Sequence, residues 1–288
     1  LQNMPILGID IGASKIHYVI WEQDAPLISE EFKLSAPAGQ SPLGGARREE
    51  LIKITQDIAQ KIKGRGVSAA GVGVPGTVED GTLRSAPNFP ELLGGDLKAE
   101  LEKILGVPVT LVNDAKAFIL AETALGAAKE FKNVVGLTLG SGLGGGLYFN
   151  GALYLGKGSA GEIGHEILDL PNLKETEDFV SAKFFQKFGS DPNTLRQQAE
   201  AGDSFAQSAF QEFGKNIGVV IANLVNLLDP EAIVLGGGIA GAYDFFIEEA
   251  KKTAAELIIN PSSQSVPILR SALGAAAGAA GAAIAASR

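Results

Sequence analysis

The chain has 288 residues, of which 45% are hydrophobic and 20% are charged. This length predicts one large domain or two lobes, and the hydrophobic fraction is too high for a disordered chain. The 24 basic residues against 33 acidic residues give a net charge of −9, which argues against nucleic acid or an anionic membrane as a partner. Cysteine is absent, so disulfides and thiolate metal sites are excluded, and a cytoplasmic location is expected.

Strands and helices alternate along the first half of the chain. Residues 6–21 predict two strands joined by a tight turn at Gly12-Ala13-Ser14, because apolar residues alternate or run continuously on both sides of that turn. The elements predicted next are a helix over 45–63, a strand over 69–74, a helix over 97–105, a strand over 107–112 and a helix over 115–125. This alternation is typical of an α/β protein.

The opening pattern recurs in the second half. Gly8-Ile-Asp-Ile-Gly-Ala-Ser14 aligns with Gly136-Leu-Thr-Leu-Gly-Ser-Gly142 at an offset of 128 residues. Both segments read as strand, glycine turn and strand, so we predict two lobes with duplicated topology; a chance match over seven residues is the alternative. We expect a smaller lobe over 1–113 and a larger lobe over 114–288.

Four more elements and a C-terminal helix complete the prediction. They are a helix over 204–228, a strand over 232–235, a helix from about Ala242, a strand over 266–269 and a helix over 274–288. The last helix consists mainly of alanine and glycine, and it is slightly short for a membrane span. We expect it to be a soluble helix that packs its small residues on a sheet, back on the first lobe.

Glycine is the unusual component of the chain. There are 37 glycines, and eleven of them lie between Gly136 and Gly164. GxGxxG occurs at 140–145 and at 236–241, but a strand follows the first, and the second lies too near the chain end for a dinucleotide domain. Residues 151–157 nearly match the P-loop motif, but the next residue, Gly158, stands where the motif needs a serine or threonine to bind magnesium. A nicotinamide-dependent oxidoreductase is therefore a minor alternative.

The glycine turns favour a phosphate site. Without a Cβ atom, such turns present backbone N–H groups to which phosphate oxygens can come close. Two turns, at 12–14 and at 140–142, are candidates for holding a polyphosphate, and ordinary hairpin turns are the alternative. Asp10 beside the first turn is suited to a magnesium ion, and Thr138 and Ser141 add hydroxyl donors at the second.

Asp114 is the candidate catalytic residue. It lies where a strand ends and a helix begins, the crevice in which α/β sheets bind ligands. A carboxylate there takes a proton from a substrate hydroxyl, whereas the alternative role is the N-cap of the helix. Asn113 and Asn88 offer amides suited to hydroxyl recognition, and Glu162 with His165 forms a pair suited to vicinal hydroxyls. Ordinary loop positions are the alternative for both asparagines.

These motifs in this order resemble the ROK family of sugar kinases and sugar-responsive repressors, within the actin-like ATPase superfamily. The resemblance covers nearly the whole chain. The segments that carry it are Gly8–Lys15, Gly71–Gly76, Ala86–Asn88, Asn113-Asp114, Thr138–Gly146, Gly161–His165, Leu235–Gly238 and Leu273-Gly274. The fold it implies is the α/β, two-lobed actin-like ATPase (ribonuclease H-like) fold with a central cleft.

The resemblance also implies a role for each matching residue. Asp114 would be the catalytic base, and Asp10 would hold the metal. The sugar-side residues would be Gly76, Asn88, Asn113, Asp114, Glu162, His165 and Glu177. The nucleotide-side residues would be Asp10, Gly12, Ala13, Ser14, Lys15, Thr138, Gly140, Ser141, Gly142, Gly237 and Gly238.

The chain departs from the family pattern after His165. Family members usually carry a zinc-binding cysteine cluster there, followed by a glutamate that touches the sugar. This chain has no cysteine, so no zinc is expected, and Glu177 matches the trailing glutamate in its local context. A repressor would carry a winged-helix segment before the first turn, and only seven residues precede Gly8, so a kinase is favoured.

The expected function is therefore an ATP- and magnesium-dependent hexose kinase acting on the 6-hydroxyl of glucose. The expected partners are a hexose, ATP and a second copy of the chain in a homodimer, without nucleic acid or membrane. Kinases for an N-acetylated hexosamine, mannose or fructose remain alternatives, as does a non-catalytic sugar-binding regulator.

Overall fold

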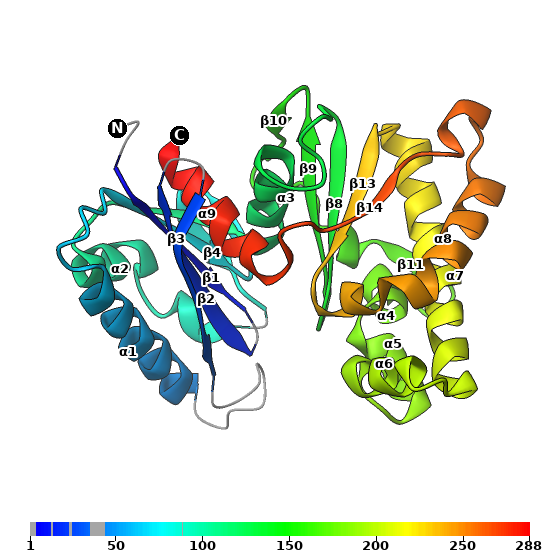
Figure 1. Ribbon diagram of the computed structural model, residues 1–288, viewed down its shortest axis with the longest axis horizontal. Coiled ribbons are helices and arrows are strands. Elements are labelled where there is room, and N and C mark those ends of the chain that lie inside the picture. Colours follow the sequence, from blue (N-terminus) through cyan, green and yellow to red (C-terminus); the bar gives the residue numbers. More distant parts are fainter. Residues whose placement is uncertain (1–3, 13, 23–24, 35–43, 88) are drawn as a thin grey trace. The chain divides into compact units, whose positions relative to one another are not determined.

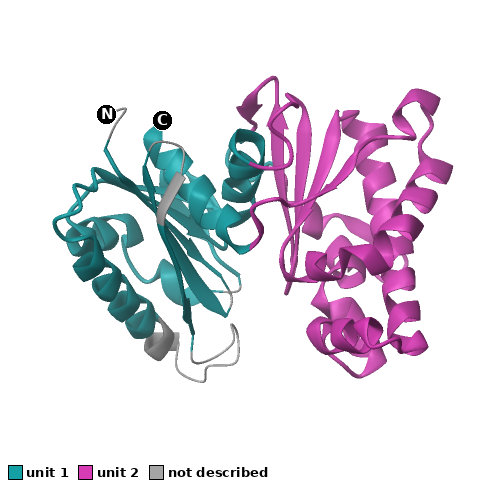
Figure 2. Ribbon diagram, viewed as in Figure 1, with its two compact units in different colours: residues 1–125, 155–160, 275–288 teal, residues 126–154, 161–274 magenta. Residues whose placement is uncertain are grey.

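The computed structural model describes residues 4–12, 14–22, 25–34, 44–87 and 89–288 (Figure 1). The chain forms two compact units, shown in Figure 2. Unit 1 contains residues 1–125, 155–160 and 275–288, and unit 2 contains residues 126–154 and 161–274. Each unit is built on a five-stranded sheet with helices, which confirms the predicted α/β class.

The sheet of unit 1 has the strand order β3-β2-β1-β4-β7. Its strands are β1 (Ile6–Ile11), β2 (Lys15–Glu22), β3 (Ala25–Lys33), β4 (Ala69–Val74) and β7 (Val109–Asn113). The first three are antiparallel neighbours, and β1, β4 and β7 run parallel. A two-stranded sheet of β5 (Thr77–Glu79) and β6 (Thr82–Ser85) and the short helix η1 (Pro90–Leu93) follow β4 in the chain.

Side chains alternate between the two faces of this sheet. Leu7, Ile9 and Ile11 of β1 belong to an apolar core that also contains residues of α1 (Gly44–Ile62) and α2 (Leu97–Leu105). The residues between them, Gly8 and Asp10, lie toward α9 (Ala277–Ser287) on the other face. On β1, one face therefore carries apolar core residues, and the other carries Gly8 and Asp10.

The C-terminal helix α9 contacts four strands of this sheet and α3 (Asp114–Ala124). A Cβ atom added at Gly8 would lie 1.9 Å from the carbonyl oxygen of Ala279, and one added at Gly71 would lie 1.7 Å from that of Ala282. The helix backbone thus lies directly on the glycines of β1 and β4, which confirms the expectation that small residues pack on a sheet. Among the described residues, no helix is both long enough and apolar enough to cross a bilayer.

The sheet of unit 2 has the order β10-β9-β8-β13-β14. Its strands are β8 (Val134–Leu139), β9 (Leu143–Phe149), β10 (Ala152–Leu153), β13 (Ala232–Gly236) and β14 (Ile268–Arg270). The remaining elements are β11 (Ile167–Asp169), β12 (Lys174–Glu175), α4 (Thr176–Val180), α5 (Ala182–Phe185), α6 (Pro192–Glu200), α7 (Ser204–Leu228), α8 (Tyr243–Leu257) and the short helices η2 (Ile163–His165), η3 (Gln186–Phe188), η4 (Gly238–Ala242), η5 (Pro261–Ser263) and η6 (Gly274–Ala276). The long helices α7 and α8 pack closely together, with Phe213 against Phe246.

The two sheets have the same topology. In each, three antiparallel neighbours are followed by two further strands that run parallel to the third. The equivalent first hairpins are β1–β2 and β8–β9, which contain the two segments that repeat in the sequence. The duplicated topology predicted from the repeat is therefore confirmed. The division after Asn113 stays a prediction, and by contacts α3 groups with unit 1.

Candidate functional site

The junction of β7 and α3 holds two of the predicted site residues. Asn113 ends β7 in an extended conformation, and its Oδ1 accepts a hydrogen bond from Lys116 N at 3.1 Å. Its Nδ2 donates to the carbonyl oxygen of Gly76 at 3.0 Å. Asn113 is therefore the N-cap of α3 and also fixes the turn after β4, so both ends of its amide bind backbone.

Asp114 is the first residue of α3. Its Oδ1 accepts from Ala115 N at 2.8 Å, and the side chain is only partly buried. The alternative role of Asp114 as the N-cap is wrong, because Asn113 caps the helix. The bond from Ala115 N therefore holds the Asp114 carboxylate in the first turn of α3, where the helix dipole is favourable to an anionic group.

Asp10 lies near the carboxyl end of β1, two strands from β7 in the sheet. Burial raises its pKa to about 7, the charge of Asp114 adds to this effect, and Lys15 opposes it. Its Oδ1 is buried and has no hydrogen-bond partner among the described residues. A Cβ atom added at Gly278 would lie 2.4 Å from Oδ2, so the carboxylate lies against the first turn of α9.

This environment fits a cation. A buried carboxylate oxygen without a donor, next to a second carboxylate, gains from a positive charge. Magnesium is usually bound by one or two carboxylates together with water and substrate phosphates, and Asp10 offers that minimal set. Within the described residues no group of three or more His, Cys, Asp or Glu side chains is arranged for a metal.

The first glycine turn follows Asp10. Gly12 N donates to the carbonyl oxygen of Lys15 at 2.9 Å, which closes the turn between β1 and β2. The Lys15 ammonium is paired with Glu31 of β3 at 2.6 Å, and Ser14 is exposed. Ala13 lies outside the described residues, as does the predicted sugar-side residue Asn88.

The second glycine turn joins β8 and β9. Gly140 N donates to the carbonyl oxygen of Gly142 at 3.0 Å, and the carbonyl oxygen of Gly140 accepts from Ala182 N at 2.8 Å. Thr138 precedes the turn on β8, and Ser141 is exposed within it. The turn is therefore held from α5 while part of it stays accessible.

Glu177 contacts this turn. Its Oε2 accepts from Leu143 N at 3.4 Å, and a Cβ atom added at Gly142 would lie 2.6 Å from the same oxygen. Its Oε1 is paired with Lys183 at 2.5 Å. The resemblance implied a sugar contact for Glu177. In the structure its carboxylate contacts the glycine turn and Lys183, and no sequence pattern indicated the contact with Lys183.

The third glycine turn lies beside the second. Strands β8 and β13 are parallel with Thr138 opposite Gly236, so the turns that follow them leave the same edge of the sheet. Gly237 has φ +83°, and a Cβ atom there would lie 2.4 Å from the carbonyl oxygen of Leu139. Gly238 then begins η4. Unit 2 thus brings together the predicted nucleotide-side residues of both turns.

Glu162 precedes the short helix η2, and His165 is its last residue. Both side chains are exposed, and His165 N donates to the carbonyl oxygen of Glu162 at 3.2 Å. His165 Nδ1 lies 3.1 Å from Glu175 Oε2, a contact that sequence reasoning missed. This hydrogen bond raises the pKa of His165, burial opposes the increase, and the charges of Glu175, Glu177 and Glu162 add to it.

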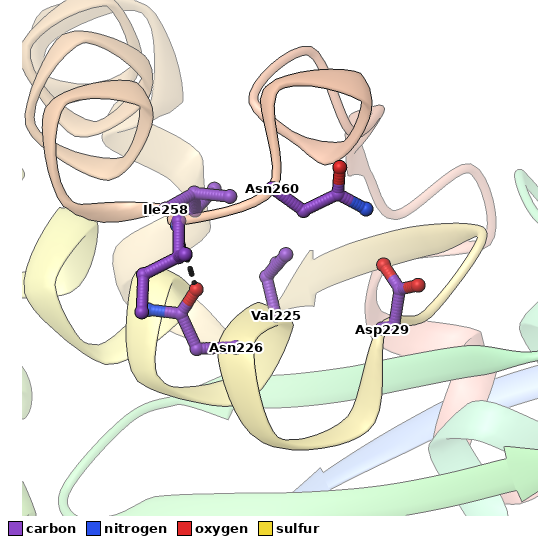
Figure 3. A pocket seen from close by; sticks show the side chains of 6 residues that line it. Val225, Asn226, Asp229, Ile258 and Asn260 are labelled. Atoms are coloured by element: carbon purple, nitrogen blue, oxygen red, sulfur yellow. Dashed lines mark hydrogen bonds between the residues drawn. The ribbon is translucent and has the colours of Figure 1, made fainter.

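A pocket of about 260 Å³ lies elsewhere in unit 2, at the ends of α7 and α8 (Figure 3). Asn226 points along its wall, donating to Leu257 O at 3.0 Å and accepting from Ile259 N at 2.9 Å. The pocket is lined by Val225, Asn226, Asp229, Ile258, Ile259 and Asn260. It contains no predicted site residue, so it does not serve the site described above.

The duplicated sheet with glycine turns at the strand ends is the actin-like ATPase fold. The chain belongs to the ROK family, whose family model matches residues 6–288. It is 27% identical over 292 residues to a glucokinase of Thermotoga maritima, with 90% of each chain covered. It is 30% identical to an N-acetyl-D-glucosamine kinase of Erwinia tasmaniensis, covering 81% of this chain and 84% of that protein.

A solved structure agrees with this assignment. A ROK family glucokinase from Streptomyces griseus, in complex with glucose and AMPPNP, has a TM-score of 0.83 and 26% sequence identity. The similarity covers 98% of this chain and 99% of that one. The predicted family and fold are therefore confirmed.

Proposed function

We propose that this protein is an ATP-dependent hexose kinase that transfers the γ-phosphoryl group to the 6-hydroxyl of glucose or a related hexose. The observation that carries the proposal is the Asp114 carboxylate, which accepts from Ala115 N at the start of α3 and whose charge acts on Asp10. The glucokinase names of two similar proteins support glucose as the acceptor.

Asp114 accepts the proton of the attacking hydroxyl. Asp114 lies in the first turn of α3, where the helix dipole favours negative charge, while burial raises the pKa of Asp10, so the two carboxylates have different roles. The sugar oxygen then attacks the γ-phosphorus, the bond to the β-phosphate oxygen breaks, and ADP leaves. Asn113 contributes by fixing Gly76 and α3, and thereby the position of Asp114.

The glycine turns hold the triphosphate. Within unit 2, backbone N–H groups of the turns after β8 and β13 supply hydrogen bonds without a lysine-rich surface, which is compatible with the net charge of −9. Asp10 would hold a magnesium ion, which would neutralise part of the phosphate charge. Glu162, His165 and Asn88 are assigned to the hexose hydroxyls.

A panel of hexoses and phosphoryl donors tests the proposal. We expect ADP release in a coupled assay with ATP and glucose, with a lower kcat/KM for mannose, fructose and N-acetylglucosamine. A higher kcat/KM with N-acetylglucosamine would change the acceptor to a hexosamine. Hexose binding in calorimetry without ADP release would make the protein a sugar-binding regulator. Replacing ATP by inorganic polyphosphate in the same assay tests whether ATP is the phosphoryl donor.

A further inference from the structure

The contact between His165 and Glu175 joins the two ends of a hairpin. His165 is the last residue of η2, and Glu175 is the last residue of β12. The imidazole Nδ1 lies 3.1 Å from the carboxylate Oε2. Among the described residues, Nε2 of His165 has no hydrogen-bond partner. One nitrogen of the ring is thus engaged by the protein, and the other remains for a ligand.

The backbone around this contact is fixed on both sides. Ile167 pairs with Glu175 across β11 and β12, and Thr176 N donates to Glu166 O at 2.8 Å. Glu175 N donates in turn to Asp178 Oδ2 at 3.2 Å at the start of α4. An exposed ion pair alone contributes little to the stability of the fold, because two mobile side chains must be ordered to form it. Here the backbones are already ordered, so the contact sets the orientation of the imidazole.

We propose that Glu175 is a positioning residue for the hexose: its carboxylate accepts the Nδ1–H of His165 and leaves Nε2 to bind a sugar hydroxyl. This inference rests on the proposed function. A neutral imidazole carries one N–H, and the carboxylate selects the form that carries it on Nδ1. Nε2 is then an acceptor for a hydroxyl proton, and after protonation of the ring it becomes a donor.

Three acidic side chains act on the charge of His165. Glu175 on β12, Glu177 on α4 and Glu162 before η2 each raise the pKa of the imidazole. Glu177 is itself paired with Lys183 at 2.5 Å, whereas Glu175 makes the direct hydrogen bond. Glu175 therefore has the largest effect on both the charge and the orientation of the ring.

Two variants separate these effects. Glu175→Ala removes the acceptor and the charge, and Glu175→Gln keeps an acceptor but removes the charge. With Glu175→Ala we expect the KM for glucose to rise by about 3- to 10-fold, the range of a single hydrogen bond, with the KM for ATP unchanged. With Glu175→Gln we expect a smaller rise, because the amide oxygen still orients the ring. In a His165→Ala background the change at Glu175 should have no further effect.

Histidine titration by NMR provides a readout without turnover. The chain has two histidines, so His165→Asn assigns both imidazole signals. We expect Glu175→Gln to lower the pKa of His165. Glu212→Gln is the matched control, because Glu212 forms an exposed ion pair with Lys187 on other elements of the same unit. This control should change neither the titration nor the KM for glucose.

The outcomes are distinct. If the pKa of His165 in Glu175→Gln equals that of the wild type, the proposed hydrogen bond between the two side chains is wrong. If the KM for glucose in Glu175→Ala equals that of the wild type, Glu175 does not position His165 for the hexose. If the protein neither binds nor phosphorylates any hexose while the titration still changes, the proposed function fails and the contact stands.

Discussion

Replacement of Asp10 by asparagine should stabilise the protein and abolish its activity. The pKa of Asp10 rises from its ordinary value of 3.8 to about 7, because the carboxylate is buried and faces the charge of Asp114. The folded chain therefore retains a proton that the unfolded chain has released between about pH 4 and pH 7. Since the folded state binds more protons in this window, stability falls as the pH rises through it and stays low above pH 7.

The magnitude follows from the same values. A change from 3.8 to about 7, at ~1.36 kcal/mol for each pKa unit, corresponds to at most ~4 kcal/mol above pH 7. Solvent reaches part of the Asp10 residue, so we expect a gain of about 2 kcal/mol for Asp10→Asn at pH 8. Near pH 4 the two proteins should have nearly equal stability, because Asp10 is already protonated in the folded chain.

Urea denaturation at pH 4.5, 6 and 8, with chelator present, measures this difference. The control is Asp244→Asn, since the Asp244 side chain is 81% exposed; its stability should stay within about 0.5 kcal/mol of the wild type. ADP release should be lost in Asp10→Asn, because the neutral amide is a poor ligand for magnesium. If Asp10→Asn at pH 8 is no more stable than the wild type, the Asp10 carboxylate does not destabilise the folded chain, because hydrogen-bond or charge partners then satisfy it.

Three further substitutions test other parts of the structure. Asp114→Asn should lower kcat by about 10²- to 10⁴-fold with little effect on stability, and turnover near the wild-type rate would remove Asp114 as the base. Gly71→Ala should destabilise unit 1 by about 3 kcal/mol in urea denaturation, because its Cβ atom would lie 1.7 Å from Ala282 O. Gly95→Ala should be nearly neutral, because its Cβ atom would lie 3.7 Å from the Arg48 guanidinium. Gly142→Ala should raise the KM for ATP several-fold by displacing the Glu177 carboxylate. A Glu177→Ala background should remove that effect, and an additive double variant would contradict it.

Local sequence patterns were sufficient for most strands and helices. The repeated segment headed by Gly8 and Gly136 predicted two copies of one sheet, and the strand orders confirm it. The edge strand β3 (Ala25–Lys33) was missed, because it continues past the first hairpin with the polar run Ser29–Glu31. The elements from β11 to α6 were also missed, since they are short and depend on tertiary contacts.

The capping of α3 shows why residue identity alone was not decisive. Asparagine and aspartate are equally good N-caps, so Asn113-Asp114 permitted either assignment. Only the fold places the Asn113 amide where it reaches both Lys116 N and Gly76 O. The same limit applied to Glu175, whose contact with His165 spans ten residues and depends on the pairing of β11 with β12.

The sequence by itself determined the family, the α/β class, the internal duplication and the residues proposed to meet the phosphates. These properties depend on glycine spacing and on local hydrophobic periodicity, which are visible along the chain. The tertiary structure decided which face of the first sheet receives α9, that Oδ1 of Asp10 is buried and its carboxylate is exposed to the charge of Asp114, and that Glu175 contacts His165. Burial, charge proximity and hydrogen bonding depend on distances between residues far apart in sequence, and those distances exist only in the folded chain.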